Sequence, residues 1–497
     1  MTAFFLTLIS LFFLIITLKL LFYTTRFKNL PPGPPFLPII GNLHQLKKPI
    51  HHTFQTLSQK HGQIFSLWLG SRLVVVVSSL KTAQEFFTKH DIVLANRPQF
   101  LFGKYINYNY TTLIQASYGD HWRNLRRIIT TEVLSSNRLN SFLEIRRDEI
   151  MRLIQKLASV SYHDFSEVEL APMFSELTFN TVMRMMSGKR YYGDDCDVSD
   201  VEEARLFREI MKEILSLGGA TNISDFLGFL RWFDFDGLEK SLKRISKRAD
   251  SFLQRLIDEH RFEKRTTNTM LDHLLKQQQS QPEYYTDQII KGLIMVMLLA
   301  GTDTSSITLE WAMTNLLNNP NILKKAKDEL DTHVGQDHLV NEHDISKLSY
   351  LQNIVYETLR LHPAAPLLLP HFSSKDFTIE KYNIPQNTIL MVNAWAIHRD
   401  PNLWIDPICF KPERFEKEGE TNKLLSFGMG RRACPGENLA HRTMSVTLGL
   451  LIQCFEWKRI GKDKIDMSEK KGVTLEKEIS LKAMCKLRHP IKIKNAF

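Results

Sequence analysis

The pattern of apolar and polar positions along the chain predicts a mainly α-helical protein with small β-sheets. Two strand-like runs, residues 64–69 and 73–77, flank a Gly-Ser-Arg turn and indicate a hairpin. Beyond the hairpin, the apolar spacing is mostly helical as far as about residue 360. Short strand signals then return at residues 377–379 and 388–392.

A continuous apolar run occupies residues 4–23 and contains a single charge, Lys19, near its end. About 20 such residues are enough to span a bilayer. A cleaved signal peptide is the alternative, but the run lacks a basic start and a small-residue cleavage site. Arg26 and Lys28 follow the run and no basic residue precedes it, so the positive-inside rule predicts that the rest of the chain is cytoplasmic.

These features divide the chain into three parts. Residues 1–24 are predicted to form a single transmembrane anchor. Residues 25–40, which include Pro-Pro-Gly-Pro-Pro, form a stiff linker, and residues 41–497 form the globular part. A chain of 497 residues, 43% of them hydrophobic, has material for two to four domains by length alone.

Charge and cysteine content narrow the classes of partner. The net charge of +10 favours an anionic membrane surface or an acidic partner protein. Nucleic acid binding is not indicated, because the sequence contains no module of interleaved basic and aromatic residues. The five cysteines are widely spaced and contain no Cys-x-x-Cys pair, which argues against a disulfide framework or a structural zinc site. We therefore expect a reducing compartment.

Residues 286–318 are predicted to form one long helix, with Thr286 as its N-cap and an end just before Pro320. The middle of this apolar helix contains Gly301 and Asp303. Glycine in a helix interior costs about 1 kcal/mol relative to alanine, and a charged side chain in an apolar setting is costly without partners. Two such costs side by side favour a functional site, although the pattern alone leaves ordinary packing equally open.

Cys434 lies in a glycine-rich loop, residues 427–436, just before an apolar run with helical spacing at residues 439–455. Backbone N–H groups of such a loop and the positive end of the helix favour a thiolate over a thiol. Glycines at 428, 430 and 436 leave room for a flat, bulky group near the backbone. Arg432 adds a fixed cation that suits a carboxylate.

Two other interpretations of this loop fit part of the pattern. A lone cysteine is usually a small buried hydrophobic residue, but the surrounding glycines and the arginine argue against that here. The spacing Gly428-x-Gly430-x-x-Ala433 also fits a loose dinucleotide-binding pattern. That pattern requires a preceding hydrophobic strand and a later acidic residue, and the sequence has neither in place.

The pattern Phe427-x-x-Gly430-x-Arg432-x-Cys434-x-Gly436 resembles the haem-binding loop of the cytochromes P450. Other motifs of that family occur in the same order, so the resemblance covers essentially the whole chain and implies one large catalytic domain with the cytochrome P450 fold. The matching motifs are Trp122-x-x-x-Arg126, Ala300-Gly301-x-Asp303-Thr304-Ser305, Glu357-x-x-Arg360 and Pro412-Glu413-Arg414-Phe415.

The resemblance implies the roles of individual residues. Cys434 would be the axial ligand of the iron of haem b (iron protoporphyrin IX), within a loop bounded by Phe427 and Gly436. Trp122, Arg126, Arg432 and His371 would face the haem propionates.

The same family motifs imply which residues are catalytic and which are structural. Ala300 and Gly301 would open a groove beside the iron. Thr304 would hold the bound oxygen and its water, and Asp303 would take part in the proton relay. The trio of Glu357, Arg360 and Arg414 would be a buried structural network.

The implied activity is that of a haem-thiolate monooxygenase. Electrons would come from NADPH through a separate NADPH–cytochrome P450 reductase, because the sequence shows no flavin or nicotinamide motif. One atom of O2 would enter the substrate and the other would leave as water. The implied location is the endoplasmic reticulum membrane, with the catalytic part cytoplasmic. We also hypothesise that Arg123 and Arg127 contribute a basic face for the acidic reductase.

Several stretches resemble plant microsomal P450s more closely, and residues 187–193, 284–287 and 465–468 are similar to those of legume isoflavone 2'- and 3'-hydroxylases. This implies hydroxylation of the B-ring of an isoflavone, such as a 4'-methoxyisoflavone, in isoflavonoid and pterocarpan biosynthesis. The alternatives are hydroxylation of another flavonoid or specialised metabolite, peroxide chemistry without O2, and a membrane-anchored haem-binding protein without turnover.

Overall fold

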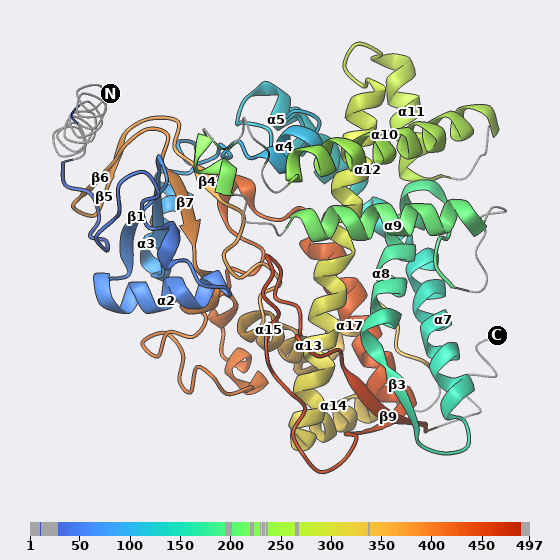
Figure 1. The fold of residues 1–497 in the computed structure, drawn as a ribbon. Helices are drawn as coiled ribbons and strands as arrows, with labels where there is room; N and C mark the ends of the chain where they lie inside the picture. Colours follow the sequence, from blue (N-terminus) through green and yellow to red (C-terminus); the bar gives the residue numbers. More distant parts are fainter. Residues whose placement is uncertain are drawn as a thin grey trace, which may run out of the picture.

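The computed structural model describes residues 10, 28–193, 201–218, 223–228, 230, 234, 237–263, 268–335 and 338–488. Helices make up most of this part of the chain (Figure 1). The α-helices are α2 (Ile50–His61), α3 (Leu80–Thr88), α4 (Leu101–Tyr105), α5 (Asp120–Arg127), α6 (Ser136–Ser141), α7 (Leu143–Ser161), α8 (Leu170–Ser187), α9 (Val201–Gly218), α10 (Leu238–Glu263), α11 (Met270–Ser280), α12 (Asp287–Gly301), α13 (Asp303–Asn318), α14 (Pro320–His333), α15 (Ser349–Leu361), α16 (Ala394–Ile397) and α17 (Glu437–Cys454).

The strands form small sheets, as the sequence pattern predicts. One sheet has the order β1-β2-β7-β4, in which β2 and β7 are parallel and the other neighbours are antiparallel. The others are β3-β9-β8 and the hairpin β5-β6. The strands are β1 (Ile64–Leu69), β2 (Arg72–Val77), β3 (Ser166–Glu169), β4 (His371–Phe372), β5 (Phe377–Ile379), β6 (Tyr382–Ile384), β7 (Ile389–Val392), β8 (Phe455–Lys458) and β9 (Lys482–Leu487).

The predicted hairpin is confirmed as β1 and β2, paired from Ile64 with Val77 to Leu69 with Arg72. Strand β2 lies between β1 and β7, and its run Val74–Val77 is fully buried. A central strand covered on both faces requires apolar residues at successive positions, which explains why this strand shows no alternation.

The predicted long helix forms, with a break near its centre. Thr286 caps its start, because its side chain accepts a hydrogen bond from the backbone N–H of Ile289. Helix α12 ends at Gly301, Thr302 departs from regular helical geometry with ψ at −72°, and α13 continues from Asp303. The two helices run through the middle of the molecule, and α13 packs against α17, which follows the cysteine loop (Figure 1).

Residues 4–23, for which a membrane span is predicted, lie outside the described part of the chain, except for Ser10. Among the described residues, the helix over Asp287–Asn318 is long and apolar enough to cross a membrane, but 72% of its apolar window is buried inside the protein. It is a core helix, because its apolar surface already has protein neighbours.

Part of the predicted linker lies against the first sheet. The backbone carbonyl of Pro31 accepts a hydrogen bond from Ser66 Oγ at 2.7 Å, and that of Pro32 accepts from the backbone N–H of Ser66 at 2.9 Å. A Cβ on Gly33 would lie 2.1 Å from the Ser66 carbonyl oxygen. Glycine at this position therefore allows the proline-rich segment to lie directly on β1.

Candidate active site

The cysteine loop begins where the sequence predicts it, directly before α17. Its turn depends on two glycines with positive φ, Gly428 at 70° and Gly430 at 72°. The backbone N–H of Cys434 donates to the carbonyl of Phe427 at 2.8 Å, which closes the loop. A Cβ on Gly430 would lie 2.8 Å from the carbonyl oxygen of Phe87, so the loop packs tightly against the end of α3.

Cys434 faces an interior space. The residue has a large accessible surface, yet burial raises the pKa of its thiol. Both observations hold together only if the accessible surface lines a recess inside the protein. The backbone N–H of Gly436 donates to Cys434 Sγ at 3.3 Å. This contact favours the thiolate as predicted, but burial outweighs it and the net shift of the pKa is upward.

Three arginines from distant segments meet beside the loop: Arg97, Arg126 and Arg432. Burial, and the positive charges of Arg97 and Arg126, lower the pKa of Arg432 to about 8. Burial alone lowers the pKa of Arg97 to about 10. Their hydrogen bonds go to backbone carbonyls: those of Leu369 and Pro370 for Arg97, Ala433 for Arg126, and Ala95, Leu113 and Ala116 for Arg432.

This cluster is rich in cations and poor in anions. Arg97 Nε is buried and has no hydrogen-bond partner within the part of the chain that the structure describes. Asp91 is the acidic residue that raises the pKa of Arg432, and it also pairs with Arg431 at 3.3 Å. Buried cations normally have anionic partners. The arrangement therefore suits a ligand that brings carboxylates to the three guanidinium groups.

Two other residues predicted to face the propionates are engaged with the backbone. Trp122 Nε1 donates to the carbonyl of Leu113 at 3.2 Å. His371 Nδ1 lies 2.8 Å from the carbonyl oxygen of Leu94, and burial, followed by the charge of Arg97, holds the pKa of His371 well below its usual value. Both side chains lie near the arginine cluster, while their roles toward a propionate stay predictions.

The centre of the long helix changes from a packed to an open environment. The apolar residues from Leu293 to Leu298 are buried, Leu299 is half-buried and Ala300 is exposed, so Ala300 lines a space rather than a packed surface. The Thr304 hydroxyl donates to the carbonyl of Ala300 at 2.7 Å. A Cβ on Gly301 would lie 3.2 Å from Val182 Cγ2, which leaves little room for a larger residue.

Asp303 is the first residue after the break. Burial, reinforced by the negative charge of Glu476 and opposed by Lys470, raises the pKa of Asp303 to about 6. A carboxyl group with a pKa near the working pH can both accept and donate a proton. The raised pKa means that burial disfavours the charged form of Asp303, in agreement with the cost expected from the sequence. A pKa near 6 also suits a role in a proton relay.

The structural trio predicted from the sequence is confirmed. Arg360 Nη2 and Nε donate to the two carboxylate oxygens of Glu357 at 2.8 and 2.7 Å, and Arg414 Nε donates to Glu357 at 3.0 Å. The side chains of Glu357 and Arg360 are fully buried. Removing one partner from such a network leaves a buried charge unpaired, which costs about 3–5 kcal/mol.

Three contributions were not predicted from the sequence. Arg97 supplies the third cation of the cluster, Asp91 accepts from the backbone N–H of Arg431 at 3.1 Å, and His398 connects the trio to the cysteine loop. The only sequence signal for Arg97 is a single charge in the otherwise uncharged stretch 92–100. Such a signal does not identify the partner of the charge.

These residues fit a planar, dianionic cofactor whose metal binds a thiolate, and haem has those properties. The iron of the cofactor would lie at Cys434, in the recess, and its carboxylates would bind to the arginine cluster. The fold and the site thus define a haem-thiolate protein.

Comparison with known proteins agrees with this class. The family model for cytochrome P450 matches residues 31–483. The chain is 78% identical over 499 residues to cytochrome P450 81E8 of Medicago truncatula, with 100% of both chains covered. It is 64% identical to the isoflavone 2'-hydroxylase of Glycyrrhiza echinata, with 93% of each chain covered. It is also 64% identical to the isoflavone 3'-hydroxylase of Medicago truncatula, with 97% of this chain and 98% of that protein covered.

The chain belongs to the cytochrome P450 family. It is a monooxygenase with haem as its cofactor and O2 as co-substrate, it receives electrons from NADPH through a reductase, and it acts on a small molecule. The predicted fold, mainly helical with small sheets, is confirmed.

Proposed function

We propose that this monooxygenase hydroxylates the B-ring of an isoflavone, at the 2' or 3' position, in isoflavonoid and pterocarpan biosynthesis. The observation that carries the proposal is the 64% identity, over more than nine tenths of the chain, to two enzymes named as isoflavone 2'- and 3'-hydroxylases. A 4'-methoxyisoflavone is a suitable first substrate, because it offers both ring positions.

When bound, haem would supply the redox chemistry that activates O2. In our proposal, Cys434 would hold the haem iron through its sulfur, and the backbone N–H of Gly436, which donates to that sulfur, would stabilise its negative charge. Arg97, Arg126 and Arg432 would hold the propionates by charge-assisted hydrogen bonds, which are stronger than neutral ones. Phe427 closes the loop through its carbonyl group and keeps Cys434 in place.

The helix break places the proton-handling groups. The Thr304 hydroxyl can turn from the Ala300 carbonyl toward a water molecule in the space that Ala300 lines. Asp303, with a pKa near 6, exchanges protons with water and passes them toward that recess. Lys470 and Glu476, which pair at 2.7 Å, are close enough for their charges to affect the pKa of Asp303.

We further propose the cellular setting that the apolar N-terminus implies. Residues 1–24 would anchor the chain in the endoplasmic reticulum membrane, residues 25–40 would form the linker, and residues 41–497 would form a cytoplasmic catalytic domain. The partner would be a membrane-bound NADPH–cytochrome P450 reductase. Deleting residues 1–24 should release the protein from microsomes without removing its haem, and a truncated protein that stays with the membrane would contradict the anchor.

The test of substrate uses the full chain in microsomes with a plant reductase and NADPH. A panel of isoflavones and flavones is supplied, and products are identified by mass spectrometry and NMR. A 2'- or 3'-hydroxyisoflavone that forms only with NADPH and O2 is the expected product. Cys434→Ser should abolish it together with the haem-thiolate spectrum, whereas Cys409→Ser, at an exposed free cysteine, should change neither.

Other outcomes separate the alternatives. A normally ligated haem with products from flavones alone would contradict the isoflavone assignment and favour another flavonoid. The broader alternative, a specialised metabolite that is not an isoflavone, is favoured by relatives such as the (+)-piperitol/(+)-sesamin synthase of Sesamum radiatum, which is 54% identical over 464 residues and is named for other products.

A further inference from the structure

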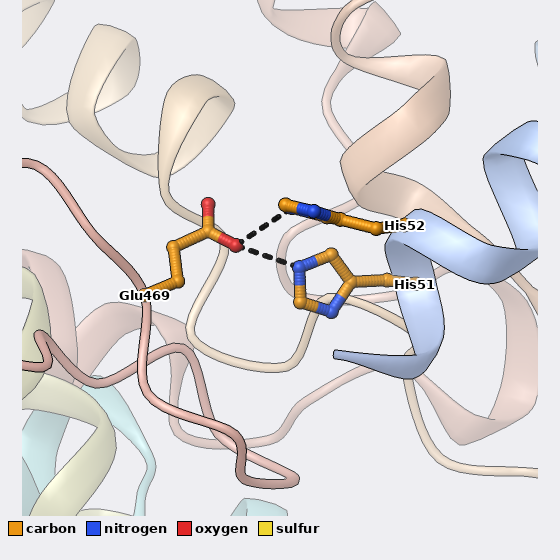
Figure 2. A group of neighbouring side chains, drawn as sticks. All are labelled: His51, His52 and Glu469. Carbon is orange, nitrogen blue, oxygen red and sulfur yellow. Dashed lines mark hydrogen bonds and ion pairs between the residues drawn. The ribbon is translucent and has the colours of Figure 1, made fainter. Parts of the chain in front are cut away.

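Three side chains outside the cysteine loop converge on one point (Figure 2). His51 and His52 lie in the first turn of α2, and Glu469 lies in the segment between β8 and β9. The Nε2 atoms of both histidines approach the same carboxylate oxygen of Glu469, at 2.7 Å from His51 and 3.0 Å from His52. All three potential ligand atoms lie within 4.8 Å of one another.

The carboxylate and the helix are held in this orientation by their neighbours. The second carboxylate oxygen of Glu469 accepts a hydrogen bond from Trp395 Nε1 at 3.0 Å. The backbone carbonyl of His51 accepts from Asn393 Nδ2 at 2.9 Å, which fixes the start of α2. Partners of this kind orient the ligands of metal sites in proteins, because they fix which atoms face the metal.

We propose that His51, His52 and Glu469 form a binding site for one divalent transition-metal ion of the zinc class. Two imidazole nitrogens and one carboxylate oxygen are donors that zinc accepts, whereas magnesium and calcium prefer all-oxygen sites. The ion would take the place of the protons that the imidazoles now share with the carboxylate. Tetrahedral zinc with bonds of about 2.0–2.1 Å needs ligand atoms about 3.3 Å apart. The nitrogen–oxygen distances of 2.7 and 3.0 Å would therefore lengthen by about 0.6 and 0.3 Å on binding zinc.

The solvent side of the cluster supplies the route and the fourth ligand. The His52 side chain is 47% exposed, whereas those of His51 and Glu469 are 3% and 10% exposed. A metal ion can therefore enter beside His52 and keep one water molecule there. The cysteine spacing gave no sign of such a site, because its ligands are histidine and glutamate.

One neighbour opposes the ion. The Arg399 guanidinium lies over the Trp395 ring at 4.1 Å from its centroid, and its positive charge interacts with both His52 and Glu469. Its repulsion should make the affinity for zinc lower than that of a four-ligand structural site. It also provides a test, since Arg399→Gln should tighten zinc binding.

Metal binding here would join two parts of the chain that are distant in sequence. Glu469 belongs to the same segment as Leu475, whose backbone N–H donates to the carbonyl of Ala364 and whose carbonyl accepts from Trp311 Nε1. An ion bound to α2 and to this segment would stabilise the folded protein, because the site does not exist in the unfolded chain.

The experiment uses the purified full-length holoenzyme, in which haem already occupies the cysteine loop. The protein is freed of loose metal with a chelator, titrated with ZnCl2, and measured for zinc per haem iron. We expect one equivalent whose zinc K-edge X-ray absorption shows two imidazoles, and a rise in the unfolding temperature on adding zinc. His52→Ala and Glu469→Gln should lose both, whereas His44→Ala, at an exposed histidine just before α2, should keep both.

The exposed position of His52 makes its alanine variant a suitable test, because the fold does not depend on that side chain. An unchanged haem spectrum will show that the variant is folded. Equal zinc content and equal thermal shift in the wild type and His52→Ala would overturn the proposal and leave the cluster as a hydrogen-bonded contact between α2 and residue 469. An absorption spectrum without imidazole scattering would overturn it as well.

Discussion

The Nε2 atom of His398 accepts a hydrogen bond from the backbone N–H of Leu425, 2.9 Å away. Its other ring nitrogen, Nδ1, lies 3.0 Å from the backbone carbonyl of Arg360 and must carry the proton of that bond. Burial, followed by the charge of Arg360, lowers the pKa of His398 to about 3, so the ring stays neutral at physiological pH. His398 thereby connects the buried charged trio to the start of the cysteine loop.

Replacing His398 should loosen the haem without removing any residue that touches it. We expect His398→Ala to lower stability by about 2–4 kcal/mol, since two buried backbone groups lose their partner, and to speed haem loss. His398→Gln should be milder, because its amide oxygen can still accept from Leu425. Haem transfer to an acceptor protein and urea unfolding are the measurements, with the exposed His333→Ala as control. Equal rates of haem loss in His398→Ala and the wild type would refute this link.

The charged Asp303 side chain should lower the free energy of unfolding. Its pKa is about 6 in the folded protein and 3.8 without the fold, so the unfolded chain loses its proton at lower pH. The folded state is therefore penalised above pH 6 by up to about 3 kcal/mol, and the penalty disappears as the pH falls toward 4. Asp303→Asn should be more stable at pH 7.5, with a smaller gain at pH 5, whereas the exposed Asp328→Asn should show no gain. The midpoints of urea unfolding at the two pH values measure whether Asp303→Asn is stabilised and whether the gain is larger at pH 7.5.

Glu476 should set the pH at which proton delivery changes. Because its negative charge raises the pKa of Asp303, Glu476→Gln should move the corresponding transition in product formation to lower pH. Lys470→Gln removes an opposing positive charge and should move it to higher pH. Product formed per NADPH between pH 5 and 8 is the readout, and Asp303→Asn should lose the transition together with about 100-fold in rate. Shifts of the same sign in both variants would contradict this assignment.

The exposed face of α5 should affect electron delivery. The side chains of Arg123 and Arg127 are 57% and 52% exposed, and each pairs on the surface with one carboxylate, Asp120 for Arg123 and Glu132, at 4.0 Å, for Arg127. Exposed ion pairs of this kind are weak, so both cations can exchange these partners for an acidic reductase. Reversing both charges to glutamate should slow reduction of the haem about tenfold at low salt and much less at high salt, where charges are screened. Stopped-flow reduction is the measurement, with Lys243→Glu on α10 as control and haem content expected to stay normal. Normal coupling to the reductase would disprove a role for this face.

Gly430 should be indispensable for two reasons, the conformation of its backbone and the lack of room for a side chain. Its φ of 72° is strained for other residues, and a Cβ would lie 2.8 Å from the carbonyl oxygen of Phe87 and 2.7 Å from Asp91 Oδ1. Gly430→Ala should therefore prevent formation of the haem-thiolate protein. Gly119→Ala, where the backbone is extended and no atom lies within 4 Å of the added carbon, should retain its haem. The measurement is the absorption spectrum of the haem in the purified variants. A normal haem-thiolate spectrum in Gly430→Ala would contradict this prediction and show that the loop can rearrange.

Much of the fold could be predicted from local patterns. The hairpin of β1 and β2, the N-cap at Thr286 and the helix after Cys434 all depend on residues that are close in sequence. Their signals are the period of the apolar positions and the turn residues between them. The unusual cost of Gly301 and Asp303 was visible for the same reason, since an interruption in a periodic pattern needs no knowledge of distant residues.

The sequence by itself thus determined the helices, the strands and the segment that carries the thiolate. Only the tertiary structure decided that Arg97, Arg126 and Arg432 form one cluster, that His398 connects Arg360 to Leu425, and that Glu469 meets His51 and His52. These contacts join residues tens to hundreds of positions apart. A charge or an imidazole has no periodic signal, so its partner is set by how helices and sheets pack, and burial then gives each side chain its pKa.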